Sequence, residues 1–222
     1  MSEAPMSTPR TRVVREPERG VYDRATAYQI LDEGFICHVG FVVDGQPYVI
    51  PTSYGRQADA LYIHGSAASR MLKRADEGIP VCVTVTLLDG LVLARSLFNH
   101  SMNYRSVVVL GTATSVNDTA EKLAALRILS DHILSGRWEQ ARQPNQKELK
   151  ATLVMRVPIE EFSSKVRQGP AIDDEADSSF PVWAGVLPFN SVPGEPISDL
   201  RLDASIELPE YVSQYSRKHS RK

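Results

Sequence analysis

The feature that most limits the fold is a series of short apolar segments separated by turns. Strands are predicted at residues 35–43, 46–54, 60–64, 81–87, 91–96, 104–116, 151–157 and 161–166. Two of the connections, Asp44-Gly45 and Asp89-Gly90, are dipeptides typical of tight hairpin turns. Short hairpins rich in β-branched residues favour a closed or split antiparallel barrel over a doubly wound sheet.

Helices are expected inside the connections of this sheet, at residues 23–33, 66–77 and 118–134. Asp23 and Asp118 are suitable N-caps, and Gly34 and Gly78 are suitable stop signals for the first two helices. No strand is followed by GxGxxG, and no GxxxxGK[ST] motif occurs, so Rossmann and P-loop folds are not indicated. The fold class predicted is mainly β with inserted helices.

Length and charge limit the organisation and the partners. The chain of 222 residues suits one domain with tails, and we expect a mobile arm at 1–20, a domain at 21–190 and a C-terminal tail at 191–222. The formal charge of -2 gives no indication of nucleic-acid binding. No apolar run reaches the length of a membrane span and no secretory signal is visible, so the cytoplasm is the expected compartment.

The cysteines and histidines give no sign of a metal site. Cys37 and Cys82 both lie in apolar strand-like runs and are expected to be buried, reduced thiols, with a disulfide as the alternative. Neither belongs to a CxxC motif, and the histidines show no ligand spacing. No metal ligand is therefore predicted.

One stretch, Tyr48 to Arg70, combines a strand end with a possible anion site. The predicted strand 60–64 runs into small residues at 65–69, and Arg70 follows where a helix begins. Small residues let backbone N–H groups approach a ligand, and a helix N-terminus and a guanidinium both attract anions. The stretch predicts a phosphate site, with an ordinary hairpin and polar loop as the alternative.

Five segments in order resemble one known family. They read VIPTSYGR, LYIHGSAASRML, VCVTVTLLDGLVLARS, NHSMNYRSVVVLG and PVWAGVLP. Over roughly residues 20–190 this order is similar to the pyridoxamine 5'-phosphate oxidase-like superfamily, most of all to its flavin-nucleotide-binding branch with the nitroimidazole-resistance-type proteins. The resemblance implies a six-stranded antiparallel split β-barrel of Greek-key type. It also implies a homodimer with two FMN sites at the subunit interface.

The same resemblance implies a set of FMN-binding residues. They are Val49, Ile50, Pro51, Thr52, Ile63, His64, Ser69, Arg70, Ser106 and Trp183. The first four would line the flavin ring with backbone groups, and the next two would approach the ring and ribityl chain. Ser69 and Arg70 would grip the phosphate, Ser106 would reach across the dimer, and Trp183 would cover the partner's flavin. Trp183 as ordinary core or interface, and His64 as a structural hydrogen-bonding group, are the alternatives.

Two departures separate the chain from the authentic oxidase. Met71 follows Arg70 where that enzyme has a lysine, and the stretch AGVLPFNSVPGEP after Trp183 lacks the arginine that holds the vitamin substrate. Oxidation of a vitamin B6 phosphate is therefore not expected.

The function predicted is that of an FMN-dependent oxidoreductase acting on an unknown small molecule. NAD(P)H is a possible reductant, and His64 is the candidate for proton transfer because its ordinary pKa lies near physiological pH. Two alternatives stay open. One is a non-catalytic flavin-binding or storage protein, and the other is a deazaflavin- or haem-binding member of the superfamily.

Overall fold

Six strands of the protein close into a ring. The computed structural model describes residues 7–66 and 78–215. The strands are β1 (Gly20–Val21), β2 (Ile36–Val43), β3 (Gln46–Gln57), β4 (Ala60–Ser66), β5 (Ile79–Leu93), β6 (Ser101–Ser115), β7 (Thr152–Pro158), β8 (Glu161–Arg167) and β9 (Gly185–Pro188). The ring runs β2-β3-β4-β7-β6-β5 and closes through the pair of β5 with β2, and all its neighbours are antiparallel. The six-stranded split barrel predicted from the sequence is confirmed.

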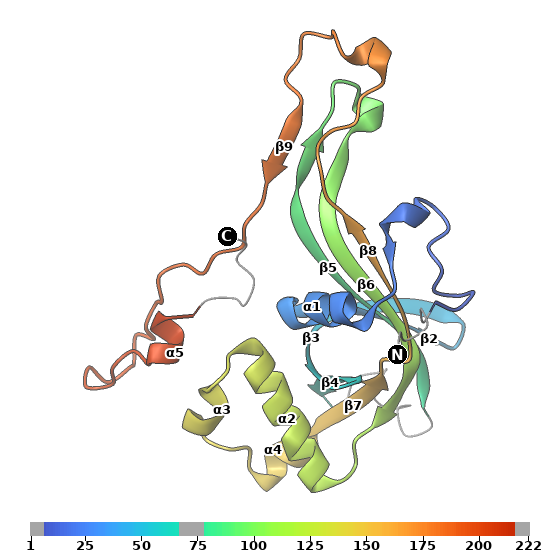
Figure 1. Cartoon of the computed structure of the whole chain (residues 1–222). Coiled ribbons are helices and arrows are strands. Elements are labelled where there is room, and N and C mark those ends of the chain that lie inside the picture. The colour runs from blue at the N-terminus through green and yellow to red at the C-terminus, as the bar shows by residue number, and fades with distance from the viewer. Residues whose placement is uncertain (1–6, 67–77, 216–222) are drawn as a thin grey trace.

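Helices lie on two sides of the barrel, except the last one, which lies apart from the barrel beside the third (Figure 1). They are α1 (Arg24–Glu33), α2 (Thr119–Ile133), α3 (Arg137–Gln140), α4 (Gln146–Ala151) and α5 (Glu210–Ser213). The predicted caps are confirmed, because Asp23 accepts a hydrogen bond from Thr26 N and Asp118 accepts one from Glu121 N, both at 2.8 Å. The predicted helix 66–77 lies outside the described residues except for Ser66, which ends β4.

The barrel interior follows the alternation of the strands. Alternate residues of each strand, such as Val39 and Phe41 in β2, point inward and are buried, and Phe162 of β8 is fully enclosed. Ile30 and Leu31 of α1 complete this core. Each such side chain contributes about 1.5–3 kcal/mol when it is removed from water.

The predicted turn at Asp89-Gly90 is wrong. β5 continues through these residues with a bulge between Leu88 and Gly90, and its hairpin with β6 turns instead at a short 3-10 helix, Leu97–Asn99. Glycine is needed at position 90 for another reason: a Cβ there would lie 2.7 Å from the carbonyl oxygen of Leu187 in β9. The outer halves of β5 and β6, residues 88–104, form an arm that extends away from the barrel (Figure 1).

The chain after β8, here called the extension (residues 168–215), wraps around this arm. It leaves β8, passes a 3-10 helix at Glu175–Asp177, and returns as β9 beside β5. Asp173 holds it to the arm by accepting hydrogen bonds from the backbone N–H groups of Arg95 (2.7 Å) and Ser96 (3.3 Å). At its end, Tyr211 of α5 donates a hydrogen bond to Gln140 of α3 (2.7 Å).

The described part of the expected N-terminal arm contacts the barrel. Thr8 donates a hydrogen bond to the carboxylate of Glu161 (2.8 Å), and β1 pairs with β8. Residues 7–20 thus have fixed contacts with the barrel strands. The mobility of the whole segment 1–20 stays a prediction. No helix in the described ranges is long and apolar enough to cross a membrane.

The two cysteines carry free thiols, as predicted. Cys37 is buried in the core and Cys82 is half-buried on the outer side of β5. Burial raises the pKa of the Cys37 thiol to about 12, so it stays protonated and unreactive at physiological pH.

Candidate functional site

The first half of β3 has a backbone edge that no described strand covers. Residues 46–53 pair with β2 on one side, whereas β4 pairs only with residues 54–57 on the other. An uncovered edge presents N–H and C=O groups that can hydrogen-bond a ligand. Val49, Ile50, Pro51 and Thr52, the four residues predicted to line a flavin ring, lie on this half-strand and are all at least partly exposed.

Ile63 and His64 follow on β4 and differ in what they can offer. The Ile63 side chain is buried in the core, so only its backbone could contact a ligand. His64 is half-buried opposite Val154 of β7, and its Nδ1 is enclosed without a hydrogen-bond partner among the described residues. Burial lowers the pKa of His64, so the imidazole is neutral at physiological pH with a nitrogen available to a ligand.

The predicted phosphate-binding pair, Ser69 and Arg70, lies outside the described residues. The strand end that leads to it is described, because Gly65 and Ser66 pair with Leu153 and Thr152 of β7. The phosphate site therefore stays a prediction from the sequence.

A broad outer face of the barrel connects several predicted residues. One row across it reads Pro51, His38, Thr84, Val108 and Ser163 on β3, β2, β5, β6 and β8. On the same face, Ile36 and Val42 of β2 are 56% and 58% exposed, and Val49 of β3 is 67% exposed.

Ser106 lies on the same face, one alternation beyond Val108, and its Oγ donates to the Lys165 carbonyl within the same chain (3.4 Å). The structure thus places Val49, Pro51 and Ser106 on one outer face of the barrel. It also adds His38, which the sequence left without a role because only the pairing of strands reveals its neighbours.

Trp183 is not brought to this face within one chain. It follows the bend of the extension near the end of the arm, where Gly185 pairs with Leu93, and it is 65% exposed. Leu93 lies nine positions after Thr84 in β5, which corresponds to about 30 Å of extended strand. Contact between Trp183 and a ligand at β3 would therefore require a second copy of the chain, and this role stays a prediction.

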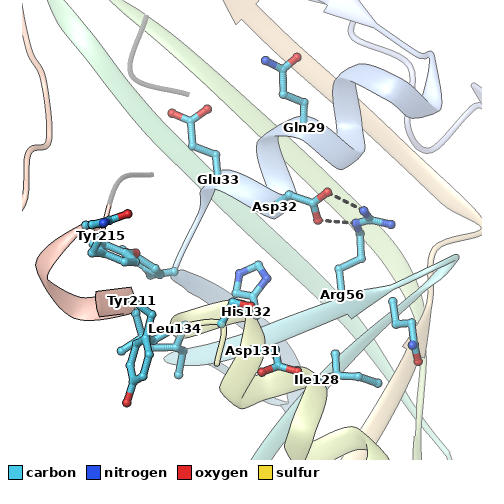
Figure 2. A pocket seen from close by; sticks show the side chains of 15 residues that line it. Gln29, Asp32, Glu33, Arg56, Ile128, Asp131, His132, Leu134, Tyr211 and Tyr215 are labelled. Carbon is cyan, nitrogen blue, oxygen red and sulfur yellow. Dashed lines mark hydrogen bonds and ion pairs between the residues drawn. The ribbon is translucent and has the colours of Figure 1, made fainter. Parts of the chain in front are cut away.

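A pocket of about 780 Å³ lies elsewhere, between α1, the far end of β3, the C-terminal end of α2 and α5. Figure 2 shows Asp32 of α1 directed at Arg56 of β3, with which it forms a bidentate ion pair. Glu33 and Asp131 add two further carboxylates to the walls. Because its walls are acidic and its arginine is already paired, the pocket does not suit the phosphate of a flavin nucleotide.

An ion-paired cluster that the sequence did not predict joins the arm to α1. Arg105 of β6 forms bidentate contacts with both Glu33 and Asp89, and all three side chains are mostly buried. The two carboxylates raise the pKa of Arg105 further, so its charge is permanent. No local signal reveals the cluster, because its members lie 16 and 72 residues apart.

The match to a known family covers the barrel. The family described as pyridoxamine 5'-phosphate oxidase matches residues 23–166. No curated protein was found to match.

Solved structures extend the similarity beyond the barrel. The flavocytochrome Anf3 from Azotobacter vinelandii is 41% identical, with 97% of this chain and 99% of that chain covered and a TM-score of 0.89. The FAD and heme binding protein from Mycobacterium smegmatis is 36% identical, with 88% and 96% covered and a TM-score of 0.83.

A protein assigned to 5-nitroimidazole antibiotic resistance, from Bacteroides thetaiotaomicron, is a less similar match. It is 26% identical, with 66% of this chain and 86% of that chain covered and a TM-score of 0.55. The resemblance to the nitroimidazole-resistance type is therefore real, but the flavocytochrome and the FAD and heme binding protein are more similar. With the barrel, its exposed β3 edge and the family match in agreement, the chain belongs to the pyridoxamine 5'-phosphate oxidase family.

Proposed function

We propose that this chain is a redox protein that binds a flavin, as FAD, together with haem. The observation that carries the proposal is the similarity to the flavocytochrome over 97% of this chain. The family match ends at residue 166, before the extension begins. The part of this chain that the flavocytochrome leaves uncovered is much shorter than the extension, so the similarity includes most of the extension. Most of the extension is thus shared with the flavocytochrome, and at least part of it with the protein described as FAD and heme binding.

The residues at β3 and β4 fit a flavin. The isoalloxazine ring carries donors and acceptors along one edge, and the uncovered backbone of residues 49–52 offers complementary groups. The enclosed Nδ1 of His64 lies on the next strand and lacks a partner among the described residues. FAD replaces the FMN expected from the sequence, because FAD is the flavin that the mycobacterial relative is described as binding.

Two histidines fit an axial ligand of haem. Haem iron is commonly held by a neutral imidazole. His100 and His132 are engaged with the carbonyl oxygens of Ala94 (3.1 Å) and Gly34 (2.7 Å). His38 and His64 have no hydrogen bond of this kind within residues 7–66 and 78–215. Either imidazole could therefore bind the metal, and His64 would serve the flavin only if His38 is the haem ligand.

When bound, a flavin handles electrons in pairs or singly and a haem handles them singly, so the two groups together link both kinds of electron carrier. The protein residues described above would bind and orient these groups and keep water away. This proposal follows the haem alternative rather than the leading expectation of an FMN-only oxidoreductase. The small-molecule substrate and NAD(P)H stay predictions from the sequence.

A homodimer accompanies this proposal. The outer barrel face exposes the apolar side chains of Ile36, Val42 and Val49 beside His38, and burial of such side chains against another protein surface is favourable. A two-fold dimer would cover the face in both copies and enclose the cofactor groups. We expect it to bury more than the roughly 1,600 Å² of a standard interface.

The cofactors can be tested with the full chain and two variants. Purified protein supplied with haem should show a Soret band, and the flavin released on denaturation should be FAD by mass spectrometry. Of the two variants His38→Ala and His64→Ala, the one that loses the Soret band identifies the axial ligand, and His100→Ala is the matched control. Retention of the band in both variants would exclude the two proposed ligands.

A further inference from the structure

The extension contains a segment, here called the strap (residues 190–208), that is exposed among the described residues. Every residue of the strap is exposed, and it contains six large apolar side chains: Val192, Ile197, Leu200, Leu202, Ile206 and Leu208. Ile197 and Leu200 are 96% and 103% exposed. Its hydrogen bonds within the described chain join strap residues to one another, as in the turns from Leu202 N to Asp199 O and from Ile206 N to Asp203 O.

Both ends of the strap are nevertheless fixed. Phe189, just before it, donates a backbone hydrogen bond to Asp89 (2.9 Å), and Tyr211, just after it, is bonded to Gln140 and Arg137. Figure 1 shows the strap projecting away from the barrel between these two anchors. An ordered segment loses conformational entropy, and no burial among the described residues offsets that loss here. The strap is therefore a candidate for contact with a second molecule.

The charge of the strap indicates which surface this is. It has four carboxylates, Glu195, Asp199, Asp203 and Glu207, and one arginine. The N-terminal segment (residues 7–20) has the opposite charge beside an apolar side chain. Arg12 and Arg15 are exposed on either side of Val14, and neither arginine has an ion pair in the described ranges.

The two surfaces cannot meet within one chain. In Figure 1 the dark blue N-terminal segment and the strap lie on opposite sides of the barrel and arm. A two-fold dimer can place the strap of one copy against the N-terminal segment of the other, and its symmetry then makes this contact twice. This placement rests on the homodimer proposed above.

We propose that the strap lies on a second copy of this chain, against its N-terminal segment, and so clasps the dimer. The apolar side chains of the strap are buried there, and its carboxylates face the arginines of that segment. The strap is then an interface element held at both ends by its own subunit.

Sedimentation velocity over a range of concentrations tests the clasp. The double variant Ile197→Asp/Leu200→Asp should raise the dimer dissociation constant about tenfold or more, because two buried apolar side chains become charged. The control Ser191→Asp/Ser198→Asp adds the same charge to the strap at polar positions, and its constant should stay within about twofold of wild type. All four positions are exposed in the single chain, so the fold should persist, which circular dichroism checks. Equal effects of the two variants, or a wild-type monomer, would overturn the proposal.

A second measurement locates the strap directly. A photo-crosslinking amino acid at position 197, in dimers mixed from isotopically heavy and light subunits, should give heavy–light crosslinks that map to residues 7–20. Crosslinks only within one subunit, or only to a different copurified protein, would contradict the clasp. Cofactor content is measured by absorbance on the same samples, so failure of the clasp with FAD and haem retained leaves the proposed function intact.

Discussion

The barrel and the extension obtain their order in different ways. In the barrel, alternate side chains of six strands meet in one core, and large residues such as Phe162 and Ile63 are fully buried. In the extension, large apolar residues such as Phe180, Trp183 and Ile197 are exposed, and a few polar contacts such as that of Asp173 fix its position. The barrel is therefore built to be stable alone, whereas the extension is built to be completed by other groups.

The largest effect should separate the two regions by stability. Phe162→Ala empties a fully buried site in the barrel and should lower the free energy of unfolding by about 3–5 kcal/mol. Phe98→Ala removes the same side chain from the arm, where it is 93% exposed, and should change that free energy by less than about 0.5 kcal/mol. Urea denaturation of both variants measures the difference. Similar losses would show that the arm also has a core within one chain.

The junction between barrel and arm should be nearly as sensitive. Arg105→Ala leaves Glu33 and Asp89 mostly buried without their cation, and we expect a loss of about 3–4 kcal/mol. Arg127 on α2 is the matched control, because its pair with Glu139 is solvent-exposed and Arg127→Ala should cost less than about 1 kcal/mol. Thermal unfolding of the two variants measures the difference. Equal shifts in Tm would show that the Arg105 cluster does not stabilise the junction more than a surface ion pair does.

The attachment of the extension should respond to pH. Burial alone would raise the pKa of Asp173, but hydrogen bonds from Arg95 and Ser96 outweigh it and lower that pKa. The contact should hold above the ordinary aspartate range and be lost as pH falls through the lowered value.

Hydrogen-exchange protection across residues 168–184, taken relative to the intrinsic exchange rate at each pH, should therefore decrease at acidic pH in wild type. It should already be low near neutral pH in Asp173→Asn. Asp174→Asn is the control, since the structure shows no side-chain cap from Asp174. Slow exchange in Asp173→Asn would mean that β9 alone anchors the extension.

The smallest effect concerns His64 in the barrel without bound cofactors. Burial lowers its pKa from the ordinary value of 6.5, so protonation opposes folding. The stability of the wild type should be unaffected by this group above about pH 6.5 and should fall as pH decreases through the lowered pKa. His64→Gln should show a shallower decline over that window in denaturation series. Parallel curves would mean that the imidazole is not buried in solution.

Much of the barrel could be predicted from the sequence because its signals are local. Asp44-Gly45 forms the predicted hairpin turn, with Asp44 at φ 51° and Gly45 at φ 79°, and Asp23 and Asp118 cap the helices that they begin. Each of these signals depends on residues only a few positions apart.

The errors came where a distant segment decides the structure. Asp89-Gly90 has the composition of a turn, yet β9, almost a hundred residues later in the sequence, packs so close that position 90 must be glycine. The carboxylate of Asp89 is bound by Arg105. The candidate site was predicted only in part for the same reason. The resemblance named Val49 to Thr52 and His64, but His38 joined them only when β2, β3 and β5 were paired.

The most direct test of the central claim is the cofactor content of the purified full chain. The account predicts that the dimer fraction contains FAD, identified by mass spectrometry after denaturation, and that the same fraction shows a Soret band after haem is supplied. A fraction that binds only FMN and never develops a Soret band would contradict it.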